Sequence, residues 1–280
     1  MSTQPILIPA RIRALMPTWR ALRLLEHVLT GAVLSAGVAS LGLARVPRPW
    51  QPALVCWWHR RLLRCLALHV SQQGTPARGA LVVANHVSWL DIPVVGGTAP
   101  LCFVSKAEVR QWPVVGWMAA TAGTLFMQRG AHQAAEMARC IAQQLRDGAS
   151  VVIFPEGTTS DGRALRRFHA RLFAAAECDG TVVQPVAIRY GHGVEPDATA
   201  PFIGDDTLLA HLWRVLRHPA LAVTVTFLPP VDGAGAGRRQ MADAAHAAIT
   251  GQLSRQTGEA VAAEGERFGR RTAAVLARRA

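Results

Sequence analysis

Short apolar runs alternate with helical patterns between residues 74 and 228, and this alternation constrains the fold more than any other feature of the chain. Helical spacing is clearest over His132–Arg146, where apolar residues recur at Ala135, Met137, Ile141 and Leu145. The runs that have the length and composition of buried strands are Ala80–Ala84, Leu101–Val104, Thr124–Met127, Val151–Phe154, Val182–Ile188 and Leu221–Leu228. Strands that alternate with helices predict an α/β fold with a mixed, largely parallel sheet flanked by helices.

Charge divides the chain into three parts. The formal net charge is +12, and residues 1–72 contain nine Arg against one acidic residue, Glu26. Residues 73–232 contain thirteen basic and thirteen acidic residues, and residues 233–280 contain eight basic and four acidic ones. We interpret these parts as basic, apolar membrane-associating helices, a neutral α/β domain and an Ala/Arg-rich helical tail.

The first part contains an apolar stretch, residues 28–44, without a charged side chain. As a helix it would span about 25 Å, which is short of the roughly 30 Å of a hydrocarbon core. A single span, a re-entrant hairpin and an interfacial helix all remain open. The next range, Trp50–Val70, combines Trp with Arg, as is typical of a membrane interface, although a helix packed on the core is an alternative.

These flanks predict a membrane surface as partner rather than nucleic acid. Lys and Arg near a bilayer contribute about 1 kcal/mol each towards anionic lipid, and no nucleic-acid-binding motif accompanies the arginines. The five cysteines lie apart without a Cys-x-x-Cys pair, which is typical of reduced thiols and gives no zinc-ligand spacing. We therefore expect no metal site, and an inner-membrane protein whose α/β domain faces the cytoplasm.

The first candidate site is Asn85–Asp91, directly after a predicted strand. Histidine as a residue type changes charge near neutral pH, so a histidine at a strand end, here His86, is suited to act as general base for a hydroxyl nucleophile. A carboxylate from Asp91 on its other ring nitrogen would fix the tautomer. Ser88 and Asp91 also have the spacing of a helix capping box, so the alternative role for Asp91 is that it only caps a helix. Both interpretations hold if Asp91 lies in the first helical turn and faces His86.

The second candidate site is Val151–Ser160, where a buried strand runs into a Pro-Glu-Gly turn. Gly157 lets the backbone approach a ligand closely, and the hydroxyls that follow it bind polar groups or cap a helix. We expect Glu156 in this turn to be either solvated or occupied with a ligand. An ordinary strand–turn–helix junction is the alternative.

Two basic residues end predicted strands. Lys106 is the only lysine of the chain, and Arg129 ends the run that begins at Gly123. Together they would pair with a phosphate. Solvated surface charge is the alternative for both. The strand Val182–Ile188, interrupted by Pro185, is interpreted as core and pocket wall.

In this order and spacing, four blocks resemble those of the glycerolipid acyltransferase family, whose best-known members are the 1-acylglycerol-3-phosphate acyltransferases. The blocks are Asn85–Asp91, Gly123–Arg129, Phe154–Thr158 and Val183–Ile188. The resemblance covers about residues 75–195. It implies these roles: His86 as base, Asp91 as its partner, Arg129 with Lys106 on a phosphate, and Glu156, Gly157 and Thr158 around the lysolipid.

The resemblance also implies the reaction. An acyl group passes directly from acyl-CoA or acyl carrier protein to the free hydroxyl of a lysolipid, with no acyl-enzyme and no bound cofactor. Backbone N–H groups near Gly157 or in the His86 loop would stabilise the oxyanion. The implied partners are membrane lipids, the lysolipid acceptor and the acyl donor.

Two departures from the family pattern concern the lysolipid headgroup. Thr159 stands where the phosphatidic-acid-forming enzymes have Arg, and the range Phe168–Arg171 lacks the usual Phe-Lys-x-Gly pattern. We therefore expect 1-acylglycerol-3-phosphate as acceptor, with lyso-ornithine lipid as the alternative. A non-catalytic membrane-binding protein is the alternative of another class. A hydrolase is a third option, which is disfavoured because the sequence has no Gly-x-Ser-x-Gly nucleophile elbow and no Cys placed to replace it.

Overall fold

The computed structural model describes residues 10–44, 46, 48–127, 131–177, 181–231 and 235–277. A seven-stranded sheet forms the centre of this part of the chain, in the order β1-β7-β6-β2-β5-β3-β4. The strands are β1 Leu68–Gln73, β2 Ala80–Ala84, β3 Cys102–Lys106, β4 Leu125–Met127, β5 Val151–Ile153, β6 Val182–Tyr190 and β7 Leu221–Phe227. Only the pairing of β6 with β7 is antiparallel. The predicted mixed, largely parallel sheet is therefore confirmed.

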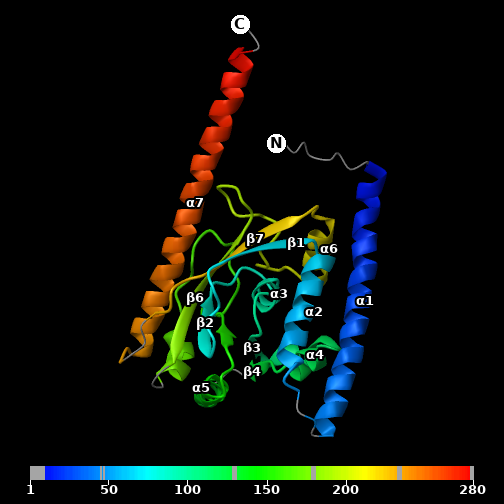
Figure 1. The fold of residues 1–280 in the computed structure, drawn as a ribbon, viewed down its shortest axis with the longest axis vertical. Coiled ribbons are helices and arrows are strands. Elements are labelled where there is room, and N and C mark those ends of the chain that lie inside the picture. The colour runs from blue at the N-terminus through cyan, green and yellow to red at the C-terminus, as the bar shows by residue number, and fades with distance from the viewer. Residues whose placement is uncertain are drawn as a thin grey trace.

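Helices cover both faces of this sheet (Figure 1). They are α1 Ala10–Leu43, α2 Gln51–Cys65, α3 Asp91–Gly96, α4 Val115–Thr121, α5 Ala131–Arg146, α6 Leu208–Arg217 and α7 Arg238–Ala277, with 3-10 helices η1 Ala107–Gln111 and η2 Ala170–Ala176. In Figure 1, α1 and α2 run side by side on one side of the sheet, and α7 runs along the other.

Two apolar cores lie on the two faces of the sheet, because successive side chains of a strand point in opposite directions. In β2, Val82 packs into the core beneath α2 and α3, and its neighbours Leu81 and Val83 pack into the core beneath α5 and α7. Every residue of β2 is buried. A strand that is buried on both faces has a continuous run of apolar residues. The predicted bounds, Ala80–Ala84, are therefore the same as those of β2 in the structure.

Residues from both segments that flank the neutral middle part are packed into the α/β domain. The sequence interpretation extends an N-terminal helix through Trp50–Val70, but α2 ends at Cys65. The chain then turns at Ala67, with φ 53°, into β1. Because β1 is mostly polar and pairs only with β7, its sequence gives no strand signal. At the other flank, Met241 and Ile249 of α7 are fully buried in the core.

The helix α1 is attached along the domain rather than free of it. A guanidinium nitrogen of Arg20 donates to the carbonyl of Leu216 at 3.1 Å, at the end of α6. Nearer the middle of α1, the His27 ring stacks on that of Trp58, with centroids 4.3 Å apart. Among the described residues, one helical stretch, Leu15–Leu43, is long and apolar enough to cross a membrane.

The parallel strands β2, β5 and β3 lie next to one another, so their carboxyl ends meet at one edge of the sheet. His86 and Phe154 lie just beyond the ends of β2 and β5, and Lys106 is the last residue of β3. Ligands of α/β proteins bind at this edge.

Candidate active site

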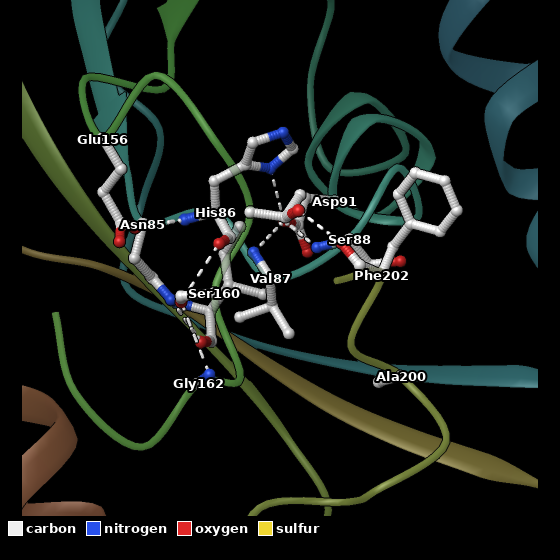
Figure 2. Close-up of polar contacts among 12 residues, drawn as sticks. Asn85, His86, Val87, Ser88, Asp91, Glu156, Ser160, Gly162, Ala200 and Phe202 are labelled. Carbon is white, nitrogen blue, oxygen red and sulfur yellow. Dashed lines mark hydrogen bonds and ion pairs between the residues drawn. The ribbon is translucent and has the colours of Figure 1, made fainter. Parts of the chain in front are cut away.

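His86 and Asp91 form a hydrogen-bonded pair at the carboxyl end of β2. Nδ1 of His86 lies 2.8 Å from Oδ2 of Asp91. The Asp91 side chain is fully buried, and the His86 side chain is 19% exposed. Because a carboxylate only accepts hydrogen bonds, Nδ1 carries the proton and Nε2 is left with a lone pair. Figure 2 shows the pair, with Nε2 on the side of the ring away from Asp91.

The same Asp91 oxygen also holds the loop between the two residues. It accepts hydrogen bonds from the backbone N–H of Val87 at 2.7 Å and of Ser88 at 2.9 Å. The bond from Ser88 is half of a capping box, but the Ser88 hydroxyl has no partner among the described residues. Asp91 therefore combines both roles considered from sequence: it lies in the first turn of α3 and faces His86.

Tyr190, the only tyrosine of the chain, completes the surroundings of Asp91. Its hydroxyl donates to Oδ1 of Asp91 at 2.7 Å from the end of β6. Burial and the charge of Asp91 raise the pKa of Tyr190 well above its usual range, so the hydroxyl stays protonated and donates. Tyr190 is not among the residues predicted from sequence, and the signal that could have indicated it is a lone tyrosine at the end of an apolar strand.

Two further residues fix the His86 loop. The Phe154 ring stacks on the His86 ring, with centroids 4.2 Å apart and an interplanar angle of 19°. The side chain of Asn85 exchanges two hydrogen bonds with the backbone of Ile188, donating to its carbonyl at 2.9 Å and accepting from its N–H at 2.7 Å. The stacking thus fixes the plane of the imidazole, and the Asn85 hydrogen bonds fix the backbone of the loop that carries it.

Glu156 is buried behind this loop, and its carboxylate accepts hydrogen bonds from two backbone N–H groups. One oxygen accepts from the N–H of His86 at 2.7 Å, and the other accepts from the N–H of Arg166 at 3.0 Å. Burial raises the pKa of the Glu156 carboxyl. Of the two arrangements expected from sequence, burial excludes a solvated side chain, and the two backbone hydrogen bonds of Glu156 join two loops.

The turn after Glu156 approaches His86 closely. Gly157 has φ 71°, a conformation that L side chains rarely adopt, and an added Cβ would lie 3.1 Å from the His169 ring. Ser160 then donates its backbone N–H to the carbonyl of His86 at 2.8 Å (Figure 2). Gly157, Thr158 and Ser160 consequently lie in the wall of one cavity with His86.

This cavity has a volume of about 910 Å³. His86 lines it, and its charged side chains among the described residues are Lys106, Asp161 and Arg166. Of the residues predicted from sequence, His86, Lys106, Gly157 and Thr158 line it, and Asp91 and Glu156 act from behind the loops. Arg129 lies outside the described residues.

A second cavity, with a volume of about 400 Å³, adjoins the first and is lined almost entirely by apolar side chains. Its walls come from α1, α2, α4 and β3, with Leu34, Leu62, Phe103 and Met118 among the lining residues. An apolar space that adjoins a histidine–carboxylate pair fits a substrate that has a reactive polar end and a long apolar part.

Comparisons with known proteins agree with this geometry. The family model described as Acyltransferase matches residues 67–189. A protein of Pseudomonas aeruginosa named lyso-ornithine lipid O-acyltransferase is 46% identical over 86% of this chain and 93% of its own length. A 1-acyl-sn-glycerol-3-phosphate acyltransferase of Neisseria gonorrhoeae is 38% identical over 58% of this chain and 65% of its own length.

A solved structure has the same fold. It is that of 1-acyl-sn-glycerophosphate acyltransferase from Thermotoga maritima, which is 24% identical and superposes with a TM-score of 0.57 over 84% of this chain and 97% of its own. Together with the near full-length relative from Pseudomonas aeruginosa, these matches show that the chain belongs to the acyltransferase family.

Proposed function

We propose that the chain transfers a fatty acyl group from a thioester donor, acyl-CoA or acyl carrier protein, to the free hydroxyl of a lysolipid. The observation that carries this proposal is the orientation of His86. Asp91 binds its Nδ1, and the ring lines the larger cavity with Nε2 free to accept a proton. The intact pair also favours catalysis over a purely membrane-binding role.

The reaction needs one proton transfer in each direction. The lysolipid hydroxyl attacks the thioester carbonyl carbon while Nε2 of His86 takes its proton, and a tetrahedral oxyanion forms. The oxyanion collapses, the C–S bond breaks, and the leaving thiolate takes the proton from His86. Asp91 stabilises the transient imidazolium, and Tyr190 stabilises Asp91.

Backbone N–H groups of Thr158 and Thr159 are the oxyanion donors that we favour. Two of the N–H groups in the regions expected from sequence are engaged, since Gly157 donates to Phe154 and His86 donates to Glu156. Those of Thr158 and Thr159 have no partner among the described residues, and both residues line the cavity. Preorganised backbone donors of this kind stabilise an acyl-transfer intermediate.

Lyso-ornithine lipid is the acceptor that we propose, ahead of 1-acylglycerol-3-phosphate. The relative named for lyso-ornithine lipid is matched over a larger share of both chains than the one named for the glycerophosphate. Further relatives carry the lyso-ornithine name, among them those from Rhodobacter capsulatus at 37% identity and from Rhizobium meliloti at 39%. Thr159 in place of the family arginine agrees with a headgroup other than phosphate.

The charges of the larger cavity support a zwitterionic headgroup. Lys106 and Arg166 are cationic and Asp161 is anionic, and none forms an ion pair with another described residue. An ornithine headgroup offers a carboxylate to the two cations and an ammonium to Asp161. A phosphate would gain from the cations but would be repelled by Asp161. Arg129 remains a proposed headgroup contact on the family resemblance alone.

Membrane association is proposed to occur through the outer face of α1. Leu15, Trp19, Leu22, Leu29 and Val33 recur at helical spacing and are more than half exposed. The opposite face of α1 packs on α2, α4 and α6. A helix attached lengthwise to a domain lies most readily in the membrane surface with its apolar row in the lipid. We propose that the domain lies on the cytoplasmic side of the inner membrane, because unpaired cysteines such as those of this chain are typical of a reducing compartment.

Acyl transfer by the purified full-length protein tests the function. Acyl-CoA and acyl carrier protein donors would each be offered with lyso-ornithine lipid, lysophosphatidic acid and other lysophospholipids, with His86→Ala as the matched control. We expect lyso-ornithine lipid to give the highest kcat/KM. Absence of transfer to every acceptor, or transfer unaffected by His86→Ala, would contradict the proposal in favour of the non-catalytic alternative.

A further inference from the structure

The indole of Trp89, in the loop between His86 and Asp91, is hydrogen-bonded to a histidine far along the chain. Its Nε1–H donates to Nδ1 of His211 at 2.9 Å. Because an indole nitrogen only donates, Nδ1 of His211 must accept, and its proton is on Nε2. That nitrogen lies 3.1 Å from the carbonyl of Ala200 and donates to it. Both ring nitrogens of His211 are therefore satisfied in one tautomer.

His211 is held rigidly in this position. It is fully buried in α6. Its ring packs edge-on against Trp89, with centroids 6.0 Å apart at 76°, and against Phe202, with centroids 5.4 Å apart at 80°. Burial lowers the pKa of His211, so the ring stays neutral and Nδ1 keeps its lone pair. The indole of Trp89 thus has one preferred orientation.

Trp89 also lies where the two cavities meet. Among the described residues, those that line both cavities are Trp89, Ile92, Val104, Ser105 and Val109, which we call the junction. Trp89 has the largest side chain of the five, and it is the one held by a hydrogen bond to α6. Leu208 and Leu212, which precede and follow His211 in α6, line the apolar cavity but not the larger one.

We infer that Trp89 contacts the acyl chain at the junction and that His211, as a positioning residue, sets how far the chain passes before its carbonyl reaches His86. The inference rests on the proposed function and adds specificity residues to it. A donor whose thioester lies beside His86 must extend its chain through the junction into the apolar cavity. An indole fixed at the junction determines which chain length places the carbonyl correctly.

The three variants that test this inference are His211→Leu, His211→Asn and Trp89→Phe. Leucine removes the acceptor, while asparagine keeps an acceptor oxygen near the position of Nδ1. Phenylalanine at position 89 removes the donor but keeps an aromatic ring. The measurement is kcat and KM for saturated acyl donors of increasing chain length, with one acceptor throughout.

We expect His211→Leu to change the ratio of kcat/KM between long and short donors by about tenfold, the scale of a small misplacement of reacting groups. His211→Asn should retain most of the wild-type ratio. Trp89→Phe should give a shift like that of His211→Leu, and the double variant should add little to either, because both changes break the same contact.

Thr226→Val is the matched control. It removes a buried hydroxyl that is hydrogen-bonded to Gln73 at 3.1 Å and that does not line either cavity. It should lower the melting temperature without changing the chain-length ratio. If His211→Leu does not fold, Trp89→Phe carries the test.

A uniform loss of kcat across all donors, with the ratio unchanged in folded His211→Leu or Trp89→Phe, would overturn the inference and make the pair merely structural. Failure of the wild-type protein to transfer any acyl chain would instead refute the proposed function. The two failures are therefore distinguishable.

Discussion

Tyr190 and His86 bind different oxygens of the same carboxylate. The Tyr190 hydroxyl donates to Oδ1 of Asp91 at 2.7 Å, and Nδ1 of His86 lies 2.8 Å from Oδ2. Because Tyr190 comes from β6 and Asp91 from the start of α3, this contact fixes the dyad relative to the sheet. The orientation of the imidazole therefore depends on a strand that follows His86 by about a hundred residues.

Tyr190→Phe tests this contact. Loss of a buried hydrogen bond to a charged group costs about 1.5–3 kcal/mol. We expect kcat to fall by about tenfold and the free energy of unfolding to fall within that range. Ser150→Ala is the control: it removes a buried hydroxyl that donates to the carbonyl of Ala77 at 3.1 Å, away from the cavity. A kcat loss in Ser150→Ala equal to that in Tyr190→Phe would show that general destabilisation explains both.

His86→Ala should lower acyl transfer by at least about a hundredfold with the fold intact, since a general base contributes on this scale. Asp91→Asn should be severely impaired as well, because the imidazole loses the charge that orients it. Steady-state rates and circular dichroism spectra measure both effects. Near wild-type activity in Asp91→Asn would reduce Asp91 to a loop and helix cap.

Glu156→Gln should destabilise the protein by about 1–3 kcal/mol, because an amide offers one acceptor where the carboxylate accepts from both His86 and Arg166. The activity should fall too, since the His86 backbone loses its anchor. Thermal or urea unfolding and kcat measure the two effects. An unchanged melting temperature would contradict the bridging role of Glu156.

The stability difference between wild type and Glu156→Gln should depend on pH. Burial raises the pKa of Glu156, so between its unfolded and folded pKa values the folded state binds more protons. Its contribution to the free energy of unfolding is fully present below the unfolded pKa and declines as pH rises through the folded pKa. The difference should consequently be larger at acidic than at neutral pH. Urea unfolding at the two pH values provides the measurement, and the opposite trend would contradict the raised pKa.

Asp161→Asn should alter acceptor preference. If Asp161 binds the ammonium of lyso-ornithine lipid, its neutralisation should raise KM for that lipid by about tenfold, the loss expected for a partly exposed charged hydrogen bond. The KM for lysophosphatidic acid should stay the same or fall. Asp243→Asn, at an exposed position of α7 away from both cavities, is the matched control. Equal effects of Asp161→Asn on both acceptors would remove the zwitterion assignment.

Binding to anionic vesicles should persist in part at high salt, because insertion of the α1 apolar row is not screened as surface charge is. Val33→Glu, at a position 72% exposed on that row, should weaken the salt-resistant fraction. Val261→Glu, 52% exposed on α7, should not. Vesicle co-sedimentation measures these fractions. Complete release of wild type by salt alone would leave only a peripheral basic patch.

Local sequence determined the parts of this protein that depend on neighbouring residues. The run Ala80–Ala84 forms β2 because five consecutive apolar residues fit a strand buried on both faces. His86 and Asp91 lie five positions apart across a loop and a first helical turn, so their contact is encoded locally. The strand β1 was missed because only its first residue is buried and its last three residues are polar, so no apolar run marks it.

Tertiary structure decided the contacts that join distant segments. Tyr190 reaches Asp91, Glu156 reaches the backbone of His86, and Trp89 reaches His211 only because the strands and α6 come together in space. The spacing of apolar residues indicates which face of a helix or strand is buried, but it does not indicate which side chain from another element packs against that face. The sequence alone could therefore predict the base and its partner, whereas the carboxylate's second ligand, the buried role of Glu156 and the junction between the cavities follow from the packing of the folded chain.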